Sequence, residues 1–211
     1  MESNHIYQDE QELGNAITHG IGTFLAICGL IVLIIMAATK GTSWHIVSFS
    51  VFGSMMVLLY LASTLYHSIR DQKLKKLFRK FDHMSIYLFI AGTYTPFCLT
   101  LLTGATKWYV LSAIWGCALL GAAMKIFYTG RRELLSTLLY ISMGWIGMVF
   151  VRQLYEMMTL QGFSFLLIGG VCYTVGAYFY MKEKIRYNHV IWHLFVLGGS
   201  TFHYFSVITL L

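Results

Sequence analysis

Residues 16–38 read AITHGIGTFLAICGLIVLIIMAA, a run without Asp, Glu, Lys or Arg. A helix needs roughly 20 mostly apolar residues to cross a bilayer. Similar runs follow along the chain, and we expect helices at about 16–38, 44–68, 82–102, 107–128, 134–154, 160–181 and 189–211. A membrane barrel is disfavoured, because its strands alternate polar and apolar residues over about 10 positions. The sequence therefore predicts an all-α fold, a polytopic bundle of seven transmembrane helices.

The composition agrees with a lipid environment. Of the 211 residues 57% are hydrophobic and 11% are charged, whereas soluble domains average about 25% charged residues. Seven spans use about 140 residues and leave about 70 for loops and ends. We therefore expect a single transmembrane domain over residues 1–211, with 1–15 as a short tail. That tail is polar and acidic, the reverse of a cleavable signal peptide, so the first span is expected to direct insertion.

Basic residues gather in alternate loops, and short cytoplasmic loops are enriched in Lys and Arg. Twelve of the 15 lie between or beside helices two and three, four and five, or six and seven: Arg70, Lys73, Lys75, Lys76, Arg79, Lys80, Lys125, Arg131, Arg132, Lys182, Lys184 and Arg186. Lys40, Lys107 and Arg152 lie on the other side. We therefore expect a cytoplasmic N-terminus and an extracytoplasmic C-terminus. The net charge of +6 then indicates contact with anionic membrane lipids and not with nucleic acid.

Ionisable residues inside membrane helices are candidates for function because they are costly to insert. Lys125, Arg152 and Glu156 lie near the ends of spans, where we expect their long side chains to reach the interface. Asp82, at the start of the third helix, has no such explanation. Histidines add to this pattern, because five of the eight fall in the half expected to face the cytoplasm: His19, His67, His83, His189 and His193.

His189 and His193 are spaced i, i+4 at the start of the last helix, so their side chains share one face. Two histidines at this spacing bind one metal ion in helical zinc sites. His67 ends the second helix and Asp82 begins the third, so these antiparallel helices bring both to a similar depth. Ser63 precedes His67 by one helical turn and shares its face. We expect these five side chains to converge near the cytoplasmic boundary.

Three histidines with an open fourth position are typical of catalytic zinc, which makes hydroxide available at neutral pH. On this hypothesis His67, His189 and His193 bind zinc, while Asp82 and Ser63 orient the water or a ligand. From spacing alone, histidines satisfied by other partners, haem ligands and a proton relay stay open as alternatives. Haem is the weaker of these, because its axial ligands come from facing helices and an i, i+4 pair points at one position.

Around these residues the sequence resembles bacterial hemolysin III proteins, in the family of the progestin and adiponectin (PAQR) receptors. The matching segments are NAITHGIG at 15–22, STLYH at 63–67, FD at 81–82, AGTYTPF at 91–97 and HVIWH at 189–193. The resemblance implies a seven-helix protein of the bacterial inner membrane with zinc on His67, His189 and His193. It implies that Ser63 and Asp82 surround the metal-bound water. Alkaline ceramidases of the wider superfamily share this set, which implies hydrolysis of a lipid amide or ester.

Three functions compete on these grounds. The first is a zinc-dependent hydrolase whose substrate is a membrane lipid. The second is a non-enzymatic protein that senses or adjusts membrane state and uses zinc only structurally. The third is the pore-forming cytolysin suggested by the hemolysin name, which the strongly apolar spans and the missing signal peptide disfavour. His19, His83 and His203 fall outside the three-ligand pattern; we expect mainly structural roles for them, with His19 the best candidate to line the site.

Overall fold

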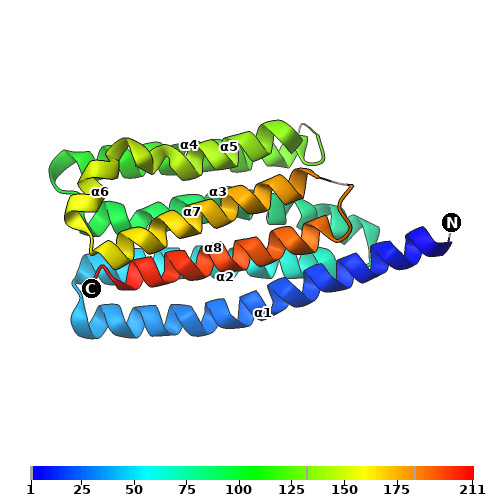
Figure 1. The fold of residues 1–211 in the computed structure, drawn as a ribbon, viewed down its shortest axis with the longest axis horizontal. Helices are drawn as coiled ribbons and strands as arrows, with labels where there is room; N and C mark the ends of the chain where they lie inside the picture. The colour runs from blue at the N-terminus through cyan, green and yellow to red at the C-terminus, as the bar shows by residue number, and fades with distance from the viewer. Residues whose placement is uncertain (1, 132, 183) are drawn as a thin grey trace.

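The computed structural model describes residues 2–131, 133–182 and 184–211, which are almost entirely helical and form no strand. The elements are α1 (Glu2–Lys40), α2 (Ser43–Ser68), α3 (Gln72–Thr100), α4 (Gly104–Tyr128), α5 (Glu133–Trp145), η1 (Ile146–Phe150), α6 (Val151–Met157), α7 (Leu160–Met181) and α8 (Asn188–Ile208). Because α5, η1 and α6 follow one another as one segment, the described chain forms seven long helical segments that run up and down one bundle (Figure 1). The predicted all-α class is confirmed.

Six of these segments are long and apolar enough to cross a membrane, among the residues described: Glu10–Lys40, Ser43–Ser68, Gly104–Tyr128, Glu133–Met157, Leu160–Met181 and Asn188–Ile208. Large apolar side chains cover their outer surfaces; Phe127 is 77% exposed and Val149 is 80% exposed. Exposing so much apolar surface to water would be energetically unfavourable. The chain is therefore a multi-pass membrane protein. The remaining segment, α3, begins with basic residues and buries many polar side chains inside the bundle, which lowers its hydropathy.

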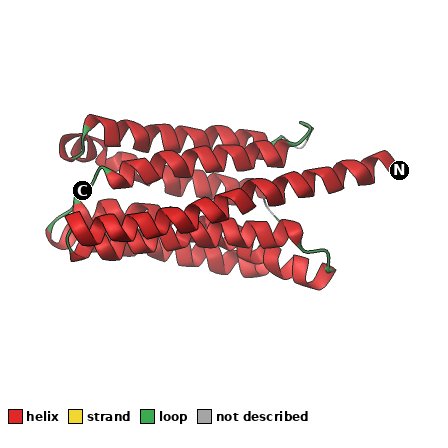
Figure 2. Cartoon of the chain, turned by 90° about the horizontal axis from the view of Figure 1, so that it is seen from below, coloured by secondary structure: helices red, strands yellow, loops and turns green. Residues whose placement is uncertain are grey.

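Two helices begin earlier than the apolar pattern predicts. Helix α1 starts at Glu2, so most of the segment predicted as a tail is helical and extends beyond the other helices (Figure 2). Helix α3 starts at Gln72, because the Asp71 carboxylate caps it by accepting hydrogen bonds from the backbone N–H groups of Lys73 at 3.0 Å and Leu74 at 2.8 Å. Such caps satisfy amides that the first turn leaves free. Most of the basic stretch is therefore helix, not loop.

The α2–α3, α4–α5 and α7–α8 connections lie at the same end of the bundle as the first turns of α1 (Figure 1). We call this the basic end. Ion pairs join its parts: Lys75 Nζ lies 2.5 Å from Glu12 Oε2, and Arg79 lies 3.9 Å from Glu133. The predicted gathering of basic residues at one end is confirmed for the residues described; Arg132 lies outside them.

The core of the bundle is built around α2 and α3. One apolar cluster joins α1, α2, α3 and α8 through residues such as Phe49, Phe52 and Tyr60, and a second joins α3 to α4 around Tyr87. Gly121 lets α4 approach closely, because a Cβ atom there would collide with the ring of Tyr87. The α5–η1 segment contacts α3 and α7 through a few side chains, and a cavity lies between it and the rest of α3, α7 and α8.

Candidate metal centre

Three histidines from two helices meet near the basic end. His67 lies in the last turn of α2, and His189 and His193 lie in the first two turns of α8. Each offers one ring nitrogen, and these three atoms lie within 4.8 Å of one another. His67 and His193 are only 6% and 2% exposed. Imidazole nitrogens in this arrangement could hold a metal ion such as zinc.

Local structure directs these side chains inward. Helix α2 ends at Ser68 because Ile69 turns to an extended conformation, which leaves His67 on the inner face of the final turn. Helix α8 begins after Tyr187, whose backbone adopts the left-handed region with φ of 57°. The Asn188 side chain then donates a hydrogen bond to the Tyr180 carbonyl at 3.3 Å. This contact joins the start of α8 to the end of α7 and sets the rotation of His189 and His193.

The chemistry of the group fits a metal. His67 Nε2 is buried and has no hydrogen-bond partner among the residues described. Buried polar atoms are almost always paired, because an unpaired one costs about 1–3 kcal/mol. Coordination would satisfy this nitrogen. Three protein ligands would leave one position of a tetrahedral zinc shell open, as in catalytic sites.

Ser63 and Asp82, the other two predicted site residues, lie beside the histidines. Ser63 is fully buried one turn before His67, and its hydroxyl oxygen makes no hydrogen bond within the described part of the chain. Asp82 on α3 lines the same cavity as His189 and His193. The fold therefore brings the three predicted histidines together, with Asp82 in the same cavity as two of them; the tasks predicted for Ser63 and Asp82 stay predictions.

All three histidines outside the ligand pattern line the cavity beside this site, and one of them contacts the three-histidine group directly. His19 stacks on His193 with ring centroids 3.5 Å apart and planes inclined by 9°. Both of its ring nitrogens are buried without a partner among the described residues, so the expectation that it lines the site holds. His83 instead lies 3.9 Å from Glu133. His203 lies about 15 Å further along α8, where its Nε2 lies 3.1 Å from the Leu166 carbonyl oxygen.

One expectation about charged residues is wrong. Lys125 does not reach the interface: it is fully buried, and its ammonium group lies 3.1 Å from Glu133 Oε2. The reason is that α5 begins with Glu133. Its carboxylate provides a counter-charge for the Lys125 ammonium inside the bundle, so the side chain does not need to reach water. Arg152 does remain at the surface, with a side chain 90% exposed and paired to Glu156 at 2.9 Å.

Three residues of the site region had no predicted role: Glu12, Asn15 and Thr18 on α1. Glu12 and Asn15 contact His67, and Thr18 contacts His193. Their spacing holds a signal that could have revealed them. Positions 12, 15, 18 and 19 fall on one helical face, and all four carry polar side chains at the start of an otherwise apolar span.

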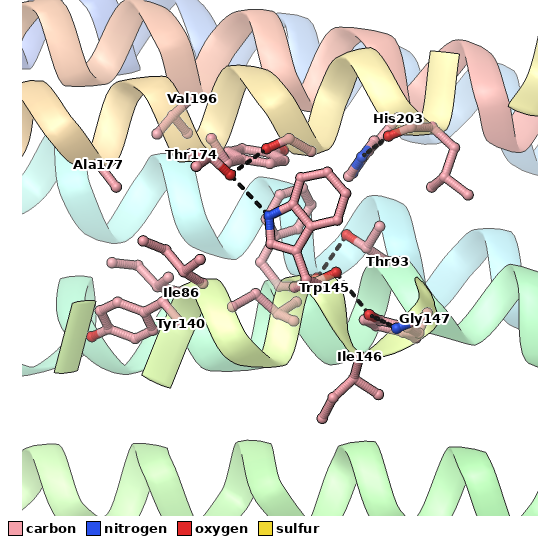
Figure 3. A pocket seen from close by; sticks show the side chains of 18 of the residues that line it. Ile86, Thr93, Tyr140, Trp145, Ile146, Gly147, Thr174, Ala177, Val196 and His203 are labelled. Carbon is pink, nitrogen blue, oxygen red and sulfur yellow. Dashed lines mark hydrogen bonds between the residues drawn. The ribbon is translucent and has the colours of Figure 1, made fainter. Parts of the chain in front are cut away.

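A cavity begins at the histidines and runs between α3, α5, α7 and α8. His189, His193 and Asp82 line it together with many apolar side chains, and its volume is about 200 Å³. Figure 3 shows Trp145 reaching across from α5 to α7, where its Nε1 donates a hydrogen bond to Thr174 Oγ1 at 2.9 Å. The cavity thus joins a polar, histidine-rich end to a largely apolar interior.

These features define a class, a multi-pass helical membrane protein with a buried three-histidine group that could bind a metal. A family model described as Haemolysin-III related matches residues 7–204, and the chain belongs to this family. Hemolysin-3 of Bacillus cereus is 53% identical over 199 residues, which cover 94% of this chain and 91% of the relative. The Hemolysin-3 homolog of Bacillus subtilis (strain 168) is 49% identical over 199 residues, with coverage of 94% and 93%.

A more distant relative extends the comparison beyond bacteria. Monocyte to macrophage differentiation factor of Homo sapiens is 25% identical over 207 residues, covering 93% of this chain and 83% of the relative. The match runs through nearly the whole bundle, including all helices that carry the site. The resemblance to hemolysin III proteins and the wider PAQR family, inferred from sequence motifs, is confirmed.

Proposed function

We propose that this protein is a zinc-dependent membrane hydrolase that cleaves an amide or ester bond of a lipid. The observation that supports it best is the position of the histidines: His189 and His193 line a largely apolar cavity together with Asp82. Ligand sites combine apolar walls with a few convergent polar groups. A lipid chain fits such walls, and its amide or ester would then lie at the polar end.

Zinc suits the three imidazoles, which are borderline ligands typical of this ion. A bound zinc ion would polarise the carbonyl of the substrate and activate a water molecule at neutral pH. The residues around it have complementary tasks. Asp82 would accept a proton from the attacking water and return it to the leaving group, as a carboxylate can in general acid–base catalysis. The Ser63 hydroxyl, which lacks a partner within the described chain, would hydrogen-bond the carbonyl oxygen or the water.

The proposal includes an orientation. The basic end would face the cytoplasm of a bacterial cell, with the N-terminus inside, the C-terminus outside and α3 as a seventh span in the inner membrane. Eleven of the 15 basic residues lie at this end within the described part of the chain, and cytoplasmic loops are enriched in such residues. The site would then open near the inner leaflet, where the basic residues attract anionic lipids.

Metal analysis and a lipid panel test the proposed activity. Detergent-purified protein should contain about one zinc ion per chain and hydrolyse at least one class of lipid amide or ester. The His67→Ala variant should lose both properties. Stoichiometric zinc without turnover of any lipid in a broad panel would count heavily against a hydrolase.

A second candidate is a non-enzymatic protein that senses or adjusts the state of the membrane. It is favoured by the origin of the ligands, since His67 comes from α2 while His189 and His193 come from α8. A metal bound there would join the two helices and stabilise the bundle. In that case zinc removal should lower the melting temperature of the protein. Cells that carry Asp82→Asn in place of the native protein should show no change in phenotype. The name Hemolysin-3 of two relatives raises membrane lysis as well, but the broad apolar surface of the spans fits a resident membrane protein better.

A further inference from the structure

One face of α1 contacts two of the proposed metal ligands, at their Nδ1 atoms and at one ring face. It consists of Glu12, Asn15, Thr18 and His19, which are spaced so that they lie within two turns on the same side of the helix. Each of the four touches His67 or His193. None of the four belongs to the three-histidine group itself. We call these four residues the α1 face.

Contacts to His67 involve its Nδ1 atom. Glu12 Oε2 lies 3.3 Å from Nδ1, and Asn15 Nδ2 lies 3.5 Å from it. A carboxylate only accepts hydrogen bonds, so the contact with Glu12 requires the hydrogen of the neutral imidazole to be on Nδ1. Asn15 Oδ1 is buried without a partner in the described chain. The oxygen and nitrogen of an Asn amide are assigned from their hydrogen bonds. With the Asn15 amide flipped, its oxygen lies beside His67 Nδ1 and gives the Nδ1–H group a second acceptor.

His193 is held in the same way. Thr18 Oγ1 lies 3.3 Å from His193 Nδ1. The threonine hydroxyl already has an acceptor for its own hydrogen, because it donates to the Gly14 carbonyl at 2.9 Å. Its oxygen is therefore free to accept a hydrogen bond from His193 Nδ1–H. These contacts fit Nδ1–H tautomers of both histidines, which would leave the Nε2 lone pairs available to a metal.

The imidazole of His19 restrains the plane of the His193 ring. The two rings are stacked nearly parallel at 3.5 Å. On its edge His19 meets the ring of Tyr60, with centroids 5.0 Å apart and planes at 85°. Tyr60 is itself held by a 2.5 Å hydrogen bond between its hydroxyl and Ser200 Oγ. The stack therefore rests on a buried, fixed ring.

We propose that the α1 face is the positioning element of the metal centre. Glu12 and Asn15 hold His67, and Thr18 and His19 hold His193, so that each ring presents Nε2 to one point. The inference rests on the proposed zinc site. Partners of this kind fix the tautomer and the ring orientation of a ligand, and their loss lowers metal affinity about 10–100-fold. Glu12 also pairs with Lys75 at 2.5 Å, which ties the element to the start of α3.

Matched threonine variants test this proposal in the full-length, detergent-purified protein. Thr18→Val keeps the shape of the side chain and removes the acceptor for His193. Thr39→Val is the control, because the Thr39 hydroxyl donates to the carbonyls of Ile35 and Met36 in its own helix and lies far from the histidines, near the end of α1. Asn15→Leu makes the equivalent change beside His67. Zinc affinity is measured by competition with a chromophoric chelator, and the ligand field by the visible spectrum of the cobalt-substituted protein.

Thr18→Val and Asn15→Leu should each lower zinc affinity about 10-fold or more and shift the cobalt spectrum. Thr39→Val should change neither. The melting temperature of the metal-free proteins separates positioning from simple folding effects. Lower metal-free stability with unchanged zinc affinity in both variants would overturn the inference while leaving the zinc site intact. If the native protein binds no zinc at all, the proposed function and the inference fail together.

Discussion

The ammonium group of Lys125 lies 3.1 Å from the carboxylate of Glu133, buried between α4 and α5. The Lys125 ammonium also lies 5.9 Å from the centre of the Tyr140 ring, whose hydroxyl donates a hydrogen bond to the His83 carbonyl at 3.0 Å. These contacts fasten α5 to α3 and α4 at the basic end. Because α5 forms one wall of the cavity, this ion pair helps to determine the width of the site.

Breaking this pair should destabilise the protein. Glu133→Gln leaves a buried ammonium group without its counter-charge, which costs about 3–5 kcal/mol in fully buried pairs and less here, because the Glu133 side chain is 31% exposed. A lower melting temperature in detergent is the expected result. Glu156→Gln is the control, since the exposed Arg152–Glu156 pair should contribute at most about 1 kcal/mol. Equal melting temperatures for the two variants would contradict the structural role.

Zinc should stabilise the folded protein. A ligand present at 1,000 times its dissociation constant stabilises the state that binds it by about 4 kcal/mol. Chelation should therefore lower the melting temperature of the native protein. In the His189→Ala, His193→Ala double variant, chelation should have no effect and the zinc content should fall. Equal zinc in both proteins would rule out the proposed site.

Asp82→Asn separates catalysis from structure. The change keeps the shape of the side chain and spares the three histidines. Loss of a general acid–base group typically slows a reaction about 10²–10⁴-fold, so lipid hydrolysis should fall by this factor at unchanged zinc content. Turnover and elemental analysis of the same sample measure both. A zinc-loaded variant with native turnover would remove Asp82 from the mechanism.

Filling the cavity should block a lipid substrate without disturbing the metal. Ala177 lines the cavity on α7 and is 3% exposed (Figure 3). Ala177→Phe should raise KM or abolish hydrolysis while zinc content stays native. Ala123→Phe, on the exposed surface of α4, is the matched control and should retain activity. Native KM in the Ala177 variant would place the substrate chain elsewhere.

Local sequence patterns determined the helical segments of this protein and the face that His189 and His193 share. Apolar runs of span length predict the helical segments, because crossing a bilayer requires a helix with internally satisfied backbone groups. The i, i+4 spacing places His189 and His193 on one face for the same local reason. Alternation of basic loops, together with antiparallel connections, is enough to bring His67 and Asp82 to the same end as that pair.

Tertiary structure decided the rest. The contacts of Asn15 with His67 and of Thr18 with His193 join residues 52 and 175 positions apart, and no local pattern specifies such partners. The early start of α3 depends on the Asp71 cap, and the burial of Lys125 depends on a carboxylate from the next helix. The sequence by itself determined which residues could do chemistry. Only the packing of α1 against α2 and α8 decided which side chains face the Nδ1 atoms of His67 and His193, because those contacts cross from one helix to another.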